Sequence, residues 1–142
     1  PAVAIIYAGT EEWISARSIA ELHSKPGKYW VLGYSEDYKS CFIKYVDDKP
    51  IAFAQCQLRH DYVEGTKSSP VGYLEGIFVS EEYRKHGYAA ELLSECEKWA
   101  KEKGCSEFAS DCELDNTNSL NFHMAMGFEE ANRVICFRKE LG

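Results

Sequence analysis

Residues 71–104 contain the feature that most constrains the fold. The segment Val71–Val79, VGYLEGIFV, has the length and apolar content of one sheet strand, and a charged turn that includes Gly87 follows it. From Ala89 to Ala100, apolar residues recur every three or four positions, which is the spacing of one buried helix face. Gly104 stands where a left-handed helix stop is expected. A strand, a turn and an amphipathic helix in this order predict an α/β fold in which a helix packs on a sheet.

The remaining segments predict a mixed sheet with helices on both faces. A turn at Asp47–Pro50 between two strands predicts a hairpin, and Gly127 predicts a second helix stop. The stretch 24–39 contains several breakers and stays ambiguous. The expected elements are strands at 2–7, 40–46, 51–58, 71–79, 107–112 and 133–139, and helices that begin near Thr10, Ala89 and Asp115. With 142 residues, the chain is expected to form a single domain, residues 1–142.

Net charge and hydropathy exclude several classes of partner. Sixteen basic and 23 acidic side chains give a net charge of −7, which argues against binding to the phosphates of nucleic acid. The same charge suits a cationic ligand. No apolar run approaches the ~20 residues of a membrane span, and no signal peptide is recognised. We therefore expect neither a nucleic-acid nor a membrane partner.

The six cysteines predict reduced thiols. They form no C-x-x-C pair, so neither a zinc site nor another metal site is expected. Five of them lie in expected strands or helices, where free cysteine packs as a small hydrophobe. This usage favours the reducing cytoplasm. Cys112 has no evident histidine partner in the sequence, so a role as a nucleophile is not expected.

The junction between the strand and the helix has the parts of a pyrophosphate site. The first turn of a helix presents unpaired N–H groups at a positive dipole end. Gly87 lets the backbone approach a phosphate closely, Arg84 and Lys85 add positive charge, and Ala89 is too small to cover the amides. The pattern R-x-x-G-x-A matches neither the nucleoside-triphosphate motif nor the dinucleotide motif. The alternative is an ordinary solvated turn.

Two stretches carry a family resemblance. The segment GIFVSEEYRKHGYAAELL resembles the acetyl-CoA-binding core of the GNAT acetyltransferases, and DNTNSLNFHMAMGF resembles their downstream motif. More narrowly, GCSEFASD and GFEEANRVICFRKEL are similar to the bacterial aminoglycoside 6'-N-acetyltransferases. The resemblance runs from about Ile51 to the end. The first third lacks the Leu-Trp-Pro stretch usual in that subgroup, and His23 and Trp30 are its nearest candidates.

The resemblance implies how acetyl-CoA is held. The expected fold is a GNAT-like, mostly antiparallel sheet that splays at its fourth and fifth strands, where the pantetheine arm adds as a pseudo-strand. The implied arm contacts are the backbone of Ile77, Phe78 and Val79, together with Asn116. The implied pyrophosphate contacts are Arg84, Lys85, His86, Gly87, Tyr88 and Ala89. Asn116 has a second interpretation as a helix N-cap, a role that Asp115 fits equally.

Glu75 interrupts an apolar strand and needs either a partner or a purpose, because a lone buried carboxylate is costly. Strict alternation places it on one face with Val71, Tyr73, Ile77 and Val79. One interpretation is a structural ion pair with an arginine of the neighbouring strand, such as Arg59. The resemblance implies the other, in which Glu75 contacts a substrate amine and accepts its proton.

The resemblance also implies further substrate and catalytic residues. Asp111 would share the recognition of a polyamine with Glu75 and is the second candidate for the base. The third acidic contact of the family falls at Asn132 here, where an acid is lost unless Glu130 compensates. His123 stands where many members of the family have a tyrosine that protonates the leaving thiolate. Histidine can act as an acid near neutral pH, but it is also common at the edge of a core.

The resemblance predicts transfer of an acetyl group from acetyl-CoA to the 6'-amine of an aminoglycoside by direct attack, which confers antibiotic resistance. One alternative is a GNAT enzyme for another amine, such as a polyamine, an amino sugar or a peptide N-terminus. Another is a non-catalytic acetyl-CoA-binding module, against which Glu75 and Asp111 argue. A homodimer is also implied.

Overall fold

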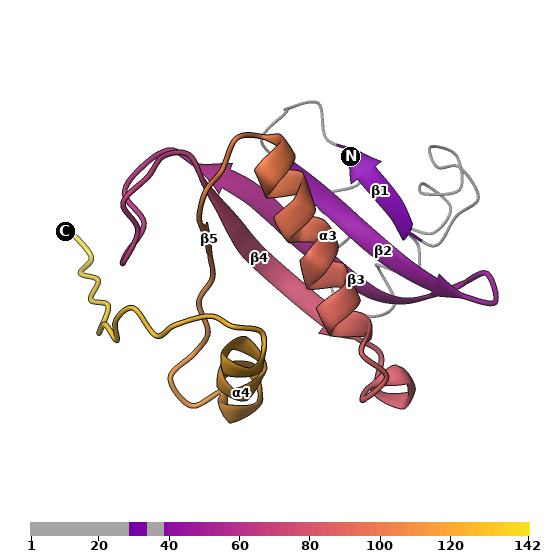
Figure 1. The fold of residues 1–142 in the computed structure, drawn as a ribbon. Coiled ribbons are helices and arrows are strands. Elements are labelled where there is room, and N and C mark those ends of the chain that lie inside the picture. The colour runs from indigo at the N-terminus through magenta and orange to yellow at the C-terminus, as the bar shows by residue number, and fades with distance from the viewer. Residues whose placement is uncertain (1–28, 34–38) are drawn as a thin grey trace.

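The computed structural model describes residues 29–33 and 39–142, and it is built on one five-stranded sheet (Figure 1). Its strands are β1 (Tyr29–Gly33), β2 (Lys39–Val46), β3 (Lys49–Arg59), β4 (Val71–Val79) and β5 (Phe108–Ala109), and its helices are the 3-10 turn η1 (Glu81–Tyr83), α3 (Tyr88–Glu102) and α4 (Thr117–Ala125). The described strands lie in the order β1-β2-β3-β4-β5, and among them only β5 runs parallel to its neighbour. The predicted mixed, mostly antiparallel sheet is confirmed.

The strand β1 falls in the stretch that the sequence left ambiguous. Its residues, YWVLG, form an aromatic and β-branched run that ends at a glycine, so a strand signal was present. The strand and helix expected at 2–7 and from Thr10 lie outside the described residues.

The predicted hairpin is confirmed, with a tighter turn than the sequence indicated. Strands β2 and β3 extend to Val46 and from Lys49, so that only two residues connect them. Asp47 and Asp48 have φ angles of 49° and 61°. Two central residues with positive φ match the twist of a two-residue hairpin, and aspartate tolerates this conformation better than most residues.

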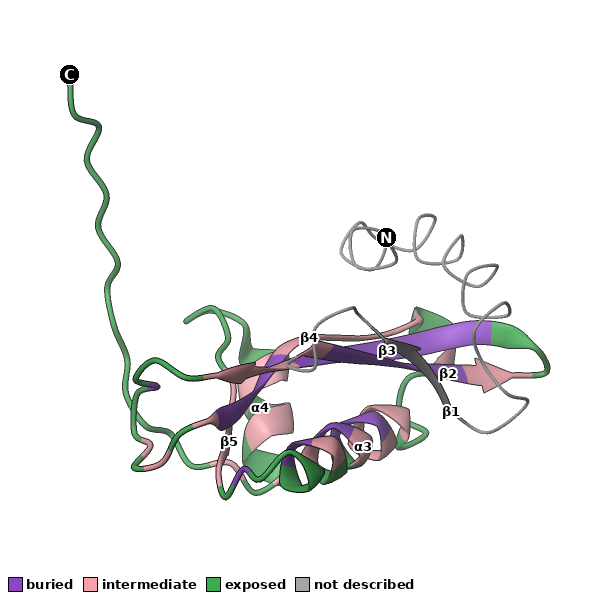
Figure 2. Cartoon of the chain, turned by 90° about the horizontal axis from the view of Figure 1, so that it is seen from above, coloured by how far each residue is buried: buried purple, intermediate pink, exposed green. Residues whose placement is uncertain are grey.

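Helix α3 covers one face of the sheet and makes the main core with it (Figure 2). Leu92 and Leu93 are at most 2% exposed, and Cys96 is fully buried. Burial of each leucine contributes about 1.5–3 kcal/mol. Phe122 of α4 and Phe128 beyond it pack against the same cluster. The helix predicted from its apolar spacing is therefore confirmed.

A bulge interrupts β4 at Glu75. Gln55 of β3 lies opposite Gly76 and Cys56 lies opposite Leu74, so Glu75 has no counterpart on β3. The extra residue shifts the alternation of side chains. Leu74 belongs to the core under α3, and Ile77 and Val79 pack against that same core.

The alternation expected from the sequence is therefore wrong beyond Glu75. Tyr73 and Val71 form a separate cluster with Val63 on the opposite face, and Glu75 reaches the arginine that stacks on Tyr73. Glu75 thus shares a face with Tyr73 but not with Ile77 and Val79. A period of two cannot reveal a bulge, because the extra residue depends on the partner strand.

Strands β4 and β5 separate after two pairs of residues. Gly72 pairs with Phe108 and Tyr73 with Ala109, and the Gly72 N–H donates to the Glu107 carbonyl at 3.1 Å. A β-carbon on Gly72 would lie 2.6 Å from the Phe108 ring and 2.7 Å from Ala100, so glycine permits this close approach. The strand expected at 107–112 is shortened to these residues, because β4 diverges from it beyond Tyr73.

The strand expected at 133–139 is absent. Residues 129–142 have no regular structure, and the chain runs away from the sheet there (Figure 2). Four apolar side chains are 71–90% exposed, namely Val134, Ile135, Phe137 and Leu141. An extended segment becomes a strand only when a neighbouring strand pairs with its N–H and C=O groups, and none of the described strands lies beside this segment.

All six cysteines are free thiols. Cys41, Cys56, Cys96 and Cys105 are buried, as expected of small apolar residues, and burial raises the pKa of Cys41 well above the ordinary value. Cys112 and Cys136 are exposed outside regular structure, so their expected placement in strands is wrong. None of the helices in the described residues is long and apolar enough to cross a bilayer.

Candidate active site

Glu75 is paired with Arg59. The arginine Nε and Nη2 atoms donate to Glu75 Oε1 at 3.1 Å and 2.8 Å, and the two side chains are 37% and 18% exposed. The pair crosses from the end of β3 to the bulge of β4. The ion pair between Glu75 and Arg59, one of the two interpretations of Glu75, is therefore present in this conformation, and the arginine neutralises the charge of the carboxylate.

Tyr73 joins Asp111 to this pair. The guanidinium carbon of Arg59 lies 3.4 Å from the centroid of the Tyr73 ring. The Tyr73 hydroxyl donates to Asp111 Oδ2 at 2.5 Å. Burial, and secondarily the hydrogen bond to Asp111, raises the pKa of Tyr73, so the phenol keeps its proton and remains a donor. One chain of contacts thus connects the two carboxylates that the sequence singled out.

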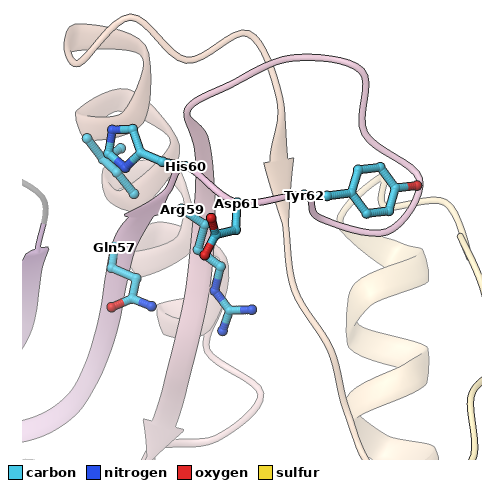
Figure 3. A pocket seen from close by; sticks show the side chains of 6 residues that line it. Gln57, Arg59, His60, Asp61 and Tyr62 are labelled. Atoms are coloured by element: carbon cyan, nitrogen blue, oxygen red, sulfur yellow. The ribbon is translucent and has the colours of Figure 1, made fainter.

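A pocket of about 460 Å³ opens at the end of β3 (Figure 3), and Arg59 both lines it and belongs to this chain of contacts. Its lining residues are consecutive: Gln57, Leu58, Arg59, His60, Asp61 and Tyr62. The loop that follows them is fixed to the chain before β5, because Glu107 accepts hydrogen bonds from Lys67 N–H and Ser68 Oγ. The Ser68 hydroxyl is the main cause of the lowered pKa of Glu107.

The far side of β4 presents backbone groups where the sheet splays. Ser80 N–H donates to the Ile51 carbonyl on β3 at 2.8 Å. Backbone groups alternate in direction along a strand, so those of Val79 and Ile77 point away from β3, toward the gap left by β5. This is the orientation that a pseudo-strand would require. The same alternation turns the backbone of Phe78 toward β3, and its ring stacks on Phe53.

The turn before α3 has an open helix N-terminus. Gly87 is the N-cap residue with a φ of 82°, and as a glycine it provides no side-chain cap for the first turn of the helix. A β-carbon at Gly87 would meet nothing within 4 Å. Lys85 also has a positive φ, 64°. The amides at the start of the helix therefore face space that an anion can enter.

Two side chains stabilise this turn from within. Arg84 Nε donates to the Val79 carbonyl at 3.0 Å, which ties the turn to the end of β4. His86 Nδ1 lies 2.7 Å from the Arg84 carbonyl, so this nitrogen carries the proton, and the ring stacks on Tyr88 at 5.7 Å. The six residues expected to hold a pyrophosphate thus span the turn and the first two residues of α3, and two of them, Arg84 and His86, contact backbone carbonyls of the protein itself.

Asn116 is the N-cap of α4. Its Oδ1 accepts the Ser119 N–H at 3.1 Å, an interaction worth about 1 kcal/mol. Asn116, and not Asp115, therefore caps this helix. Its carboxamide nitrogen is not used in the cap, so a second contact from the same side chain is compatible with this geometry.

His123 is held in one tautomer between two serines. Its Nδ1 lies 2.7 Å from the Ser119 carbonyl, which can only accept, so Nδ1 donates. Nε2 lies 2.7 Å from Ser110 Oγ, and in the neutral ring it accepts the hydroxyl proton. Ser110 follows β5 directly, at the point where β4 and β5 separate. The histidine is therefore connected to the splay through a hydroxyl group.

Asn132 has a partner outside the chain of contacts that joins Glu75 to Asp111. Its Nδ2 donates to Glu64 Oε1 at 3.3 Å, which fixes it to the loop after β3. Glu130, the suggested replacement for the lost acid, pairs with Arg133. Arg133 lowers the pKa of Glu130 by hydrogen bonding. The structure therefore joins Glu75 to Asp111, and it attaches Asn132 and Glu130 to other partners.

Tyr73 and Ser110 are two site residues that the sequence did not single out. The sequence gives only a weak indication of either residue, because a tyrosine in a strand and a serine after a strand have ordinary structural explanations. Their roles depend on Asp111 and His123, which lie 38 and 13 positions away. Only the folded chain brings these pairs together.

Comparison with known proteins decides the family. Residues 7–128 match the model described as Acetyltransferase (GNAT) family. The chain belongs to this family. The predicted family and fold class are thereby confirmed, and the splay of β4 and β5 lies where the resemblance implied it.

Several curated relatives share one name. Aminoglycoside N(6')-acetyltransferase type 1 of Serratia marcescens is 48% identical over 97 residues, which are 68% of this chain and 66% of the relative. The protein of that name from Salmonella typhimurium is 48% identical over 103 residues, or 72% of this chain and 71% of the relative. The chain thus matches just under two thirds of the length of the Serratia protein.

Solved structures show the same likeness. AAC(6')-Iy in complex with the bisubstrate analogue CoA-S-monomethyl-acetylneamine is 46% identical, with a TM-score of 0.72 over 75% of this chain and 72% of that one. AAC(6')-IG from Acinetobacter haemolyticus, in its apo form, is 35% identical, with a TM-score of 0.73 over 95% and 85% of the two chains.

The open turn before α3 gives a direct test of acetyl-CoA binding. Gly87→Asp places a carboxylate where a pyrophosphate would meet the helix amides, so the affinity for CoA in calorimetry should fall at least tenfold, the effect of about 1.4 kcal/mol. Gly104→Asp is the matched control, because Gly104 has a φ of 91° and similarly open surroundings at the other end of α3. Equal affinities in the two variants would contradict the assignment of the turn.

Proposed function

We propose that this chain transfers the acetyl group of acetyl-CoA to the 6'-amine of an aminoglycoside. The observation that carries this proposal is the position of Glu75. It occupies the bulge at which β4 leaves β5, and Tyr73 and Arg59 connect it to Asp111. The relatives named aminoglycoside N(6')-acetyltransferase support the choice of substrate, as does the AAC(6')-Iy complex with a CoA bisubstrate analogue.

The residues of the site can perform this transfer by direct attack. An alkylammonium has a pKa near ~10.4, so removing its proton at neutral pH costs about 4 kcal/mol. Glu75 is our first candidate for the base that accepts this proton, directly or through water, and Asp111 is the second. The neutral amine then attacks the thioester carbonyl, and the outward-facing N–H of Val79 is placed to stabilise the oxyanion.

The leaving thiolate takes the last proton. We propose that protonated His123 supplies it through Ser110. The Ser110 hydroxyl gives its proton to sulfur as it receives another from His123 Nε2, so the serine ends unchanged. The distance of 2.7 Å between Ser110 Oγ and His123 Nε2 supports this relay. A thiolate is a good leaving group, so the proton relay through Ser110 should contribute less to the rate than the base that deprotonates the amine.

An aminoglycoside suits the charge of the site, because it carries several ammonium groups. Glu75 and Asp111 offer two carboxylates, and the whole chain has a net charge of −7. We propose that these two acids recognise the drug. Asn132, which is hydrogen-bonded to Glu64, is proposed as a third contact, but it lacks the charge to strengthen binding.

The regiochemistry of the product tests the proposal. With acetyl-CoA and kanamycin A, we expect release of free CoA thiol and a product acetylated at the 6'-nitrogen, as identified by two-dimensional NMR. An analogue that has a hydroxyl group in place of the 6'-amine should release no CoA. Acetylation at another amine would contradict the proposed position, and acetylation of spermidine or a peptide N-terminus alone would favour the alternative substrates.

Replacing Glu75 separates catalysis from binding. Glu75→Gln keeps the size of the side chain and removes the base, so kcat should fall by about 10²–10⁴, whereas a role in binding alone would raise KM at constant kcat. Glu102→Gln, an equal loss of charge at the exposed end of α3, is the control and should leave both constants unchanged. If neither constant changes in Glu75→Gln, the ion pair with Arg59 is purely structural.

We further propose that the chain is a cytoplasmic homodimer. Six free thiols are typical of a reducing compartment. The exposed apolar side chains between Val134 and Leu141, in a segment with the composition of a strand, favour pairing with a second copy. Light scattering should give the mass of a dimer, and Cys136 should be slower than Cys112 to react with a thiol reagent. A monomer with two equally reactive cysteines would contradict the dimer.

A further inference from the structure

Arg59 places a positive charge at the carboxylate that is the first candidate for substrate recognition. Two of its donors, Nε and Nη2, bind the same oxygen of Glu75. None of the described residues hydrogen-bonds the other oxygen, Oε2. The guanidinium lies against the Tyr73 ring at 3.4 Å. A carboxylate beside the face of an aromatic ring is a general recognition site for an organic cation.

We propose that Arg59 is a resident cation that occupies the ammonium site of the substrate, so that a cationic substrate binds by displacing it from Glu75. This inference rests on the proposed function, and it assigns to Arg59 a role in substrate selection. The residue is a competitor for Glu75 and takes no part in proton transfer.

The surroundings allow Arg59 to leave. Its side chain is 37% exposed, so the guanidinium already contacts solvent on one side. It also lines the pocket at the end of β3, and the carboxylate of Asp61 lines the same pocket (Figure 3). The guanidinium can therefore exchange Glu75 for water and a second carboxylate. A fully buried pair could not separate in this way without leaving an uncompensated charge in the protein.

A tethered competitor raises the affinity that any cation needs to fill the site. Arg59 is present at an effective concentration of about millimolar or more, because it is part of the same chain. An amine with a single charge must outcompete it at one carboxylate. A polycation has further contacts, beginning with Asp111, that compensate for the loss of the Arg59 pair. Arg59 thus sets a threshold of affinity that favours ligands with several contacts, although it weakens the binding of monocations and polycations by the same factor.

Arg59→Met tests this role. Methionine keeps an apolar stem against Tyr73 and removes the charge, so in calorimetry kanamycin A and glucosamine should both bind about tenfold more tightly than to the wild-type protein. Arg59→Lys retains the charge and should stay within about threefold of wild type. Lys49→Met is the matched control, because it removes an equal charge from the exposed pair of Lys49 with Glu82, and it should not change the affinity. Unchanged CoA binding verifies that each variant is folded.

Unchanged or weaker amine binding by folded Arg59→Met would overturn the inference, because an arginine that only orients Glu75 would weaken binding when lost. The wild-type protein gives a second measurement. The Nε–H resonance of Arg59, identified by its loss in Arg59→Lys, should shift when kanamycin A or spermidine saturates the site. A resonance that does not move at saturation rejects the displacement.

The two proposals can fail separately. If kanamycin A is acetylated while the Arg59 resonance stays in place, the displacement is wrong and the proposed function stands. If an amine displaces Arg59 but no aminoglycoside is acetylated, the proposed function is wrong and the role of Arg59 stands. If neither kanamycin A nor spermidine binds, both are wrong.

Discussion

The bulge at Glu75 is the constraint on which the site depends. One extra residue in β4, opposite the step from Gln55 to Cys56, reverses which side chains face the helix. Glu75 is thereby placed with Tyr73 on the face away from α3, and the backbone of the following residues turns toward the gap beside β5. A carboxylate and a set of open backbone groups thus meet at one point, which is where we propose that the amine reacts with the thioester.

The electrostatics of this point are balanced within the protein. Two carboxylates could repel each other and raise the cost of folding, but Arg59 neutralises Glu75 and Tyr73 donates to Asp111. The pair is partly exposed, so its contribution to stability is modest and its charges are screened by salt. The proposed displacement depends on this balance, because a ligand must be able to replace a partner that the free protein uses.

Several elements followed from local patterns in the sequence. The strand Val71–Val79, the hairpin turn at Asp47, the apolar stripe of α3 and the helix stops at Gly104 and Gly127 all depend on residues close in the chain. Backbone conformation and periodicity act over such short distances, so the sequence determines them. The turn before α3 belongs to this group. The family could also be predicted from the sequence, because its motifs are short stretches of neighbouring residues.

Tertiary structure decided the features that require contact with a second, distant segment of the chain. The bulge requires β3 as a reference, and the shortened β5 requires the divergence of β4. The segment 133–139 has the composition of a strand but does not form one, because a strand needs a neighbouring strand to pair with its backbone. The partners of Glu75 and His123 lie 16 and 13 residues away. Composition names such residues as candidates, and only packing determines which of them touch.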